Sequence, residues 1–277
     1  MPLVTPSLAL IIFVAGAASG ALGALLGIGG GVFLVPFLNL GLHFPFTVAA
    51  AISLTTVIAT SSSVSAGRAG EQLINIRLGM LLEVATAGGS LLGGVTAQVL
   101  AQSTVQRVFG VVTAIVAVIM LTRLQRRNVI LDPGIDPGLL GGRYYEDESG
   151  GMVTYRLKRL PVALVASFVA GNMSSLLGIG GGFIKVPVLN AWCGIPLRAA
   201  AATSAFMIGV TATAGAVIYY GTGQLVPALA AAAILGVQLG SWVGMRFGQR
   251  ASAKWLKLLM AAVLFIVSAI MLTRGTR

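Results

Sequence analysis

Long uninterrupted apolar stretches dominate the chain, and charged residues are confined to the segments between them. No Lys, Arg, Asp or Glu occurs in residues 1–67, 199–245 or 258–273. Apolar runs of roughly 18 or more residues without charge are typical of membrane-spanning helices. The pattern therefore predicts an all-α polytopic membrane protein.

The second half of the chain repeats the first. An offset of 151 residues aligns GALGALLGIGGGVFLVPFLNLGLHFP at 20–45 with GNMSSLLGIGGGFIKVPVLNAWCGIP at 171–196. Farther along the offset drifts to 147, where Gly89 aligns with Gly236. We therefore expect two homologous repeats on either side of a polar segment. The expected units are a first transmembrane repeat at 1–123, a polar inter-repeat flap at 124–160 and a second transmembrane repeat at 161–277.

Each repeat shows the same succession of predicted elements. An apolar helix runs into the phrase LLGIGGG (25–31 and 176–182), a short apolar stretch follows, and three long transmembrane helices complete the unit. The first helix and the short stretch form a glycine-broken helix or a re-entrant hairpin. The predicted elements are 8–26, 32–42, 47–66, 78–101 and 105–123 in the first repeat, and 161–177, 183–193, 198–220, 225–245 and 255–273 in the second.

The distribution of charge favours an inverted arrangement of the two repeats. With inverted repeats, 14 of the 18 Lys and Arg residues share one side of the membrane, against 11 for parallel repeats. Cytoplasmic loops carry an excess of cations, so inverted repeats and a cytoplasmic flap are expected. The flap holds five of the seven acidic residues, and its alternation around Ser149-Gly150-Gly151 predicts a β-hairpin.

Composition excludes several classes of function. The net charge is +11, but the cations lie between apolar runs and form no stripe that would bind nucleic acid. The sequence has one cysteine, one histidine and a single acidic residue within a predicted span. These cannot assemble a metal cluster or a nucleophile–base–orienter set, so neither an enzyme nor a bound metal or cofactor is expected.

The glycine phrases do not match a nucleotide site. A Rossmann fingerprint follows a strand and needs a later acidic residue, and a P-loop needs Lys-Ser/Thr after the glycines; both are missing here. In membranes, glycines either allow close helix packing or break a helix where it lines a cavity. A helix that starts after such a break points free N–H groups at an anion. We therefore predict a substrate site at Gly29, Gly30, Gly31, Gly180, Gly181 and Gly182, with pure packing as the alternative.

Two charged residues lie inside apolar sequence. Lys185 follows the second glycine phrase, where the first repeat has Leu34. A lysine in the centre of a membrane helix costs about 2.5–3.5 kcal/mol, so Lys185 is a candidate anion ligand unless it snorkels to the interface. Glu83 is a candidate for proton coupling or a partner for Lys185 or Arg68, with an interfacial position as the alternative.

Neutral polar residues complete the predicted site. Asn39 and Asn190 occupy equivalent positions and either brace the breaks or donate hydrogen bonds to a ligand. Ser53, Thr203 and Ser204 are further candidate donors, although hydroxyls in membrane helices often bond their own backbone.

The duplicated motif LGIGGGxxxVPxLN, followed by AAATS at 200–204, resembles the TauE/SafE sulfite exporter family, also called the toluene sulfonate uptake permease family. The resemblance implies transport of small sulfur-containing anions such as sulfite or organosulfonates. AAAIS at 49–53 departs from the motif, which suggests that the halves contribute unequally. The expected function is a proton-coupled secondary transporter in the cell membrane, embedded in the lipid bilayer. An anion channel or a transporter of a different small anion remains the alternative, and association as a homodimer is left open.

Overall fold

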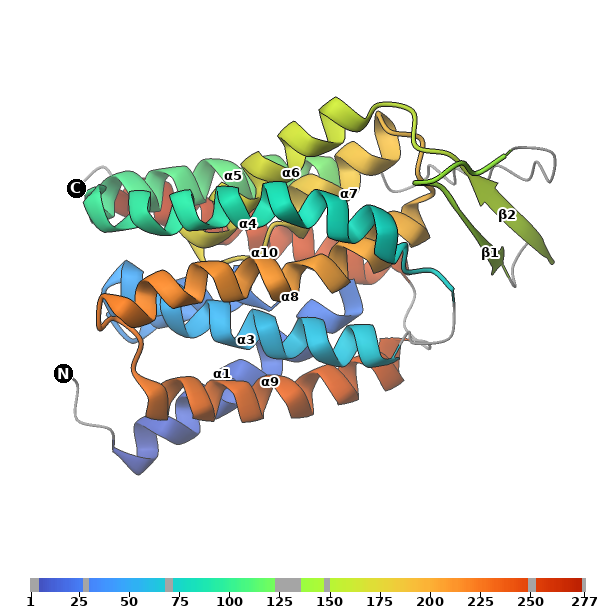
Figure 1. Ribbon diagram of the computed structural model, residues 1–277. Helices are drawn as coiled ribbons and strands as arrows, with labels where there is room; N and C mark the ends of the chain where they lie inside the picture. The colour runs from blue at the N-terminus through green and yellow to red at the C-terminus, as the bar shows by residue number, and fades with distance from the viewer. Residues whose placement is uncertain are drawn as a thin grey trace.

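The computed structural model describes residues 5–26, 30–67, 72–122, 136–146, 150–248 and 253–275. The helices lie side by side in one bundle, with a two-stranded sheet at one end (Figure 1). The first repeat contains α1 (Pro6–Leu26), α2 (Gly31–Pro36), the π-helical turn η1 (Phe37–Gly41), α3 (Phe46–Gly67), α4 (Ile76–Val99) and α5 (Gln102–Thr122). After strands β1 (Gly142–Glu146) and β2 (Gly151–Tyr155), the second repeat contains α6 (Leu160–Leu177), α7 (Gly182–Ala191), α8 (Leu197–Gly221), α9 (Pro227–Gly248) and α10 (Ala253–Gly275).

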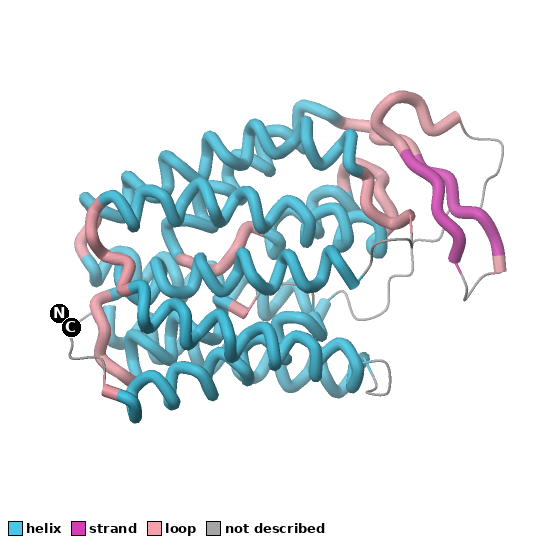
Figure 2. Tube along the Cα trace, turned by 60° about the horizontal axis from the view of Figure 1, so that its bottom comes forward, coloured by secondary structure: helices cyan, strands magenta, loops and turns pink. Residues whose placement is uncertain are grey.

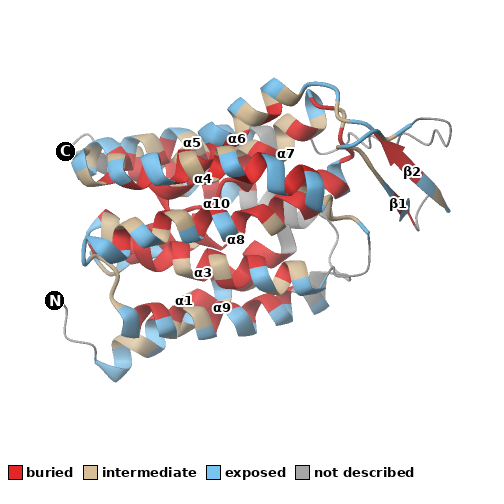
Figure 3. Ribbon diagram, in the orientation of Figure 1, coloured by how far each residue is buried: buried red, intermediate tan, exposed pale blue. Residues whose placement is uncertain are grey.

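Length and surface chemistry identify the bundle as a membrane domain. Six helices within the described residues, α1, α3, α4, α6, α8 and α9, are long and apolar enough to cross a bilayer. The outer faces carry the exposed residues (Figure 3), and these include apolar side chains such as Val84, which is 76% exposed, and Leu235, which is 61% exposed. A soluble helix would be polar there, whereas a lipid-facing helix is apolar. The prediction of an all-α multi-pass membrane protein is confirmed.

The short stretch after each glycine phrase is helical. In the first repeat, α2 reaches Pro36 and continues as the π-helical turn η1. Proline has no N–H to donate to the preceding turn, which favours a change of helix type at this point. In the second repeat, Pro187 lies inside the ten-residue α7. Short loop segments also lie in the interior of the bundle, away from the loops at its two ends (Figure 2).

The helix α3 runs in the opposite direction to α8, its counterpart in the second repeat. Along α4 and α8 the contacts advance together, from Gly79 beside Thr203 to Gly94 beside Ile218, so these two helices are parallel. Because α3 and α4 are consecutive antiparallel helices (Figure 1), α3 is antiparallel to α8, its counterpart. This is the relation that inverted repeats require; their orientation across a bilayer stays a prediction.

Glycines bring the backbones of the two repeats into contact. A Cβ on Gly16 would lie 2.6 Å from the carbonyl oxygen of Ala233, and one on Gly20 would lie 2.5 Å from that of Val237. Gly244 of α9 meets Ala21 of α1 in the same way. The equivalent pair, α4 and α6, shows the same close approach. Small residues therefore permit the helix packing that stabilises a membrane bundle.

The β-hairpin covers one end of α4, α7 and α8. Tyr144 and Tyr155 are buried in a cluster that also contains Leu78 and Cys193. Asn75, which caps α4, donates from Nδ2 to the carbonyl oxygens of Leu140 at 3.0 Å and Gly141 at 3.1 Å. The hairpin is thus packed against the membrane helices and is not a detached loop.

Candidate functional site

The two glycine breaks contact each other inside the bundle. A Cβ on Gly31 would lie 2.6 Å from Oγ of Ser53 and 3.0 Å from Cα of Ile179, which belongs to the second break. Ser53 in turn donates a hydrogen bond of 2.5 Å to the carbonyl oxygen of Gly178. The end of α6 at Gly178 is left-handed, with φ of 71°, as is typical of a glycine that ends a helix. The breaks of both repeats therefore form one structural unit.

Backbone atoms, not open space, surround the glycines of this unit. A Cβ on Gly30 would lie 2.8 Å from the carbonyl oxygen of Ser19, and one on Gly181 would lie 2.7 Å from that of Ala170. Gly180 has φ of 76° and Gly182 is the first, buried residue of α7. These contacts favour the packing interpretation for Gly30 and Gly181. Gly29 lies outside the described residues.

Asn39 and Asn190 hold the turns that follow the short helices. Asn39 donates from Nδ2 to the carbonyl oxygen of Phe44 at 2.8 Å and accepts from Nε2 of Gln106 at 2.9 Å. Asn190 donates in the same way to the carbonyl oxygen of Ile195 at 2.9 Å. Both amides therefore stabilise chain reversals, which agrees with the bracing role among the two that the sequence left open.

Two of the three predicted hydroxyl residues form hydrogen bonds within the protein, and the third has no partner among the described residues. Oγ1 of Thr203 accepts from the backbone N–H of Asn75 at 3.0 Å, at the end of the bundle below the hairpin. Ser204, one residue along α8, is fully buried, and within the part of the chain that the structure describes its Oγ has no hydrogen-bond partner. Ser204 thus keeps an unused donor in the interior, whereas Ser53 and Thr203 already have partners.

Lys185 and Glu83 meet through a hydroxyl group. Lys185, in the first turn of α7, has no exposed surface, and its Nζ lies 3.5 Å from Oγ1 of Thr211 on α8. Thr211 donates to Oε1 of Glu83 on α4 at 2.7 Å. Glu83 is 7% exposed, and its Oε2 has no hydrogen-bond partner among the described residues. Both side chains are therefore buried among the helices, and the structure brings them together beside the second glycine break.

Thr211 was not predicted from the sequence. It is one of many hydroxyl residues in apolar helices, and the only cue is its position seven residues after Ser204, on the same helix face. Ser90 and Ser175 were also missed. Ser90 lies 2.5 Å from Oγ of Ser175 and donates to the carbonyl oxygen of Thr211 at 2.6 Å. These residues extend the polar cluster along α4, α6 and α8.

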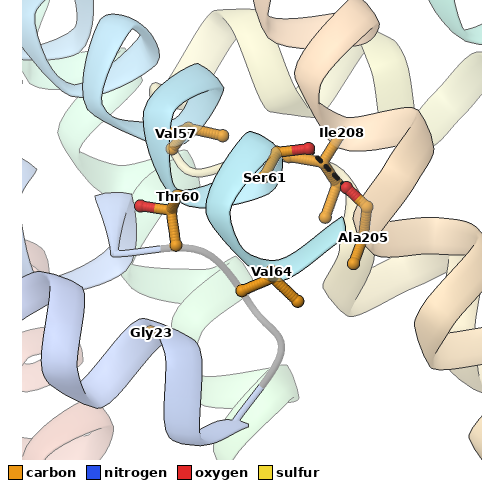
Figure 4. A pocket seen from close by; sticks show the side chains of 7 residues that line it. All are labelled: Gly23, Val57, Thr60, Ser61, Val64, Ala205 and Ile208. Carbon is orange, nitrogen blue, oxygen red and sulfur yellow. Dashed lines mark hydrogen bonds between the residues drawn. The ribbon is translucent and has the colours of Figure 1, made fainter. Parts of the chain in front are cut away.

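The equivalent place in the first repeat lacks the charges. The offset of 151 pairs Lys185 with Leu34 and Thr211 with Thr60, and the offset of 147 pairs Glu83 with Ala230. Thr60 lines a small pocket between α1, α3 and α8 (Figure 4). Its hydroxyl bonds its own helix, at the carbonyl oxygen of Thr56. The remaining lining residues are Gly23, Val57, Ser61, Val64, Ala205 and Ile208. The charged pair therefore has no charged counterpart at the equivalent positions Leu34 and Ala230.

Comparison with known proteins extends over nearly the whole chain. The family model described as "Sulfite exporter TauE/SafE" matches residues 12–271. A probable membrane transporter, YunE of Bacillus subtilis (strain 168), is 24% identical over 272 residues, which cover 96% of this chain and 97% of the relative. Another, MJ0441 of Methanocaldococcus jannaschii, is 26% identical over 129 residues, 43% of this chain and 48% of the relative. No solved structure matches.

A plant relative matches a shorter segment. Sulfite exporter TauE/SafE family protein 6 of Arabidopsis thaliana is 40% identical over 73 residues, which cover 26% of this chain and 17% of the relative.

Proposed function

This chain belongs to the TauE/SafE sulfite exporter family and is a membrane transporter, and we propose that it moves small sulfur-containing anions such as sulfite or organosulfonates, coupled to protons. The observation that carries the proposal is the buried hydrogen-bonded group of Lys185, Thr211 and Glu83 beside the second glycine break. Burying an ammonium group in a membrane protein costs free energy, so a buried lysine there indicates a functional site in which the charge is paired.

Lys185 supplies the positive charge that attracts an anion. In the described structure its Nζ makes one long hydrogen bond, to Thr211, so donors remain for the oxygens of a ligand. The low polarity around it strengthens the attraction between the ammonium and an oxyanion. Ser204, whose buried hydroxyl has no partner among the described residues, offers a further donor about two turns earlier on the same face of α8.

Glu83 supplies the proton-binding group. Oε1 is held by Thr211, and Oε2 is free to take up a proton or accept one from a ligand. A carboxylate close to the anion site couples the two events, because an anion and an ionised carboxylate repel each other in a buried site. Protonation of Glu83 therefore favours anion binding, and release of the proton favours release of the anion.

The cation-rich end of the bundle is the proposed cytoplasmic side of the cell membrane. The start of α4, the hairpin, the start of α8 and the end of α9 lie at this end (Figure 1), and they carry Arg77, Arg143, Arg198 and Arg246. Cytoplasmic segments are enriched in such residues. Cysteines introduced in the loop 68–75 and at 222–224 should react with an impermeant reagent from opposite faces. Reaction of both from one face would contradict this orientation and the inverted repeats.

Transport by purified protein in proteoliposomes tests the proposed function. We expect uptake of sulfite or methanesulfonate above that of protein-free vesicles, and faster uptake when the vesicle exterior is acidic. Sulfate serves as a comparison of similar shape. If none of these anions enters with or without a pH gradient, the proposed function is wrong.

A further inference from the structure

The electrical charge of the site follows from a small number of groups. Among the described residues, two ionisable side chains face it, Glu83 from α4 and Lys185 from α7, and their charges cancel. The helices α3 and α6, which also pack here, contain no ionisable residue between Phe46 and Gly67 or between Leu160 and Leu177.

The other ionisable groups of the surrounding elements lie toward the ends of the helices or are bonded elsewhere. On α8, Arg198 pairs with Glu146 of the hairpin at 3.8 Å, and Tyr219 donates to the carbonyl oxygen of Ser175 at 2.9 Å. Arg77 lies at the first turn of α4, and the hydroxyl of Tyr155 in the hairpin lies 3.4 Å from Nδ2 of Asn75. The unloaded site is therefore neutral when Lys185 and Glu83 are both ionised.

When an anion binds, the net charge of the site changes by an amount that depends on the charge of the anion. A buried net charge is strongly unfavourable in a medium of low polarity. A monoanion alone leaves the site with one negative charge, and a dianion such as sulfate leaves it with two. One added proton restores neutrality for a monoanion but not for a dianion.

The hydrogen-bonding groups fit the same stoichiometry. Lys185 keeps two N–H donors for ligand oxygens, and Oε2 of Glu83 has no hydrogen-bond partner among the described residues. A proton between Oε2 and a ligand oxygen satisfies the carboxylate, whichever of the two atoms carries it. Thr211 can release Glu83 without losing its own bond, because the carbonyl oxygen of Met207 lies 3.0 Å from its hydroxyl.

We propose that the site loads one sulfur monoanion together with one proton shared between the ligand and Glu83, so that transport is electroneutral and fully ionised dianions are excluded. This inference rests on the proposed function. The proton and the anion enter from the same side and leave on the other, and no net charge crosses the membrane.

Separate control of pH and voltage in proteoliposomes tests this stoichiometry. The probe is whichever of methanesulfonate and sulfite is taken up, and potassium with valinomycin sets the voltage. We expect a gradient of one pH unit to sustain about a tenfold accumulation, and a potential of 59 mV, equivalent to tenfold for one charge, to have no effect. Sulfate should enter at least tenfold more slowly than the probe.

The variant Glu83→Gln provides the matched measurement, because it keeps the shape of the side chain and removes its charge. Its accumulation should lose the response to pH and follow the potential, since the monoanion then crosses unaccompanied. Accumulation that follows the potential in the unmodified protein, or that stays pH-driven in Glu83→Gln, would overturn the inference while leaving the proposed function intact. Absence of uptake of every probe would overturn both.

Discussion

At the scale of single residues, one hydroxyl organises the charged site. Thr211 bonds Oε1 of Glu83 and lies within reach of Nζ of Lys185, and it is fully buried. Thr60 is its counterpart in the first repeat and donates to the carbonyl oxygen of Thr56 in its own helix. Comparing substitutions of Thr211 and Thr60 therefore separates the loss of the contacts to Glu83 and Lys185 from the general effect of losing a buried hydroxyl.

We expect Thr211→Val to lower the melting temperature of the empty protein more than Thr60→Val does. The substitution leaves polar atoms of Glu83 and Lys185 unpartnered, at about 1–3 kcal/mol for each unsatisfied group. Added substrate anion should restore part of the lost stability in Thr211→Val, because the ligand replaces the hydroxyl. Thermal unfolding in detergent with and without sulfite measures both effects, and equal melting temperatures for the two variants would contradict them.

The sequence predicts some of these residues and not others for physical reasons. Lys185 and Glu83 stand out because charge is rare in apolar helices and costly there. The role of Asn39 depends on which backbone carbonyl its amide reaches, so the motif alone leaves it open. Thr211 and Ser90 are selected only by the packing of α4 against α8, which no local pattern in the sequence specifies.

At the scale of the elements, glycine determines how closely helices approach. We expect Gly20→Ala to destabilise the protein by about 1–3 kcal/mol, as overpacking does, because its Cβ would lie 2.5 Å from the carbonyl oxygen of Val237. Gly88→Ala on α4 is the control, since nothing lies within 4 Å of its Cβ and alanine favours the helix. Melting temperatures in detergent should fall for Gly20→Ala only; a fall of the same size in Gly88→Ala would refute the packing argument.

The helices themselves were predictable, whereas their partners were not. Apolar runs define the spans, and the elements after both glycine phrases begin and end close to the predicted residues. In a membrane, however, residues facing lipid and residues facing protein are equally apolar, so hydropathy does not show that α1 packs on α9. The breaks were expected to surround a ligand, but contacts at Gly30 and Gly181 are with neighbouring backbone.

At the scale of the whole molecule, the hairpin closes one end of the half that holds the charged site. Cys193 is buried beneath it, and burial raises the pKa of its thiol, so it should react slowly with a maleimide at pH 7. We expect Tyr155→Ala, which removes a buried ring of the hairpin, to accelerate the reaction. Tyr145→Ala should not, because Tyr145 is 56% exposed. Equal rates in both variants would show that the hairpin does not shield this end.

The most direct test of Lys185 as the anion ligand is sulfur-anion uptake driven by a pH gradient. It is measured side by side for the unmodified protein, Lys185→Met and Lys185→Arg. Lys185→Met should lose uptake while the protein stays folded in the membrane. Lys185→Arg should restore it only partly, because a planar guanidinium does not replace a compact ammonium in a fully buried site. Full uptake by Lys185→Met, with unchanged affinity for the anion, would contradict the central claim that Lys185 binds the substrate.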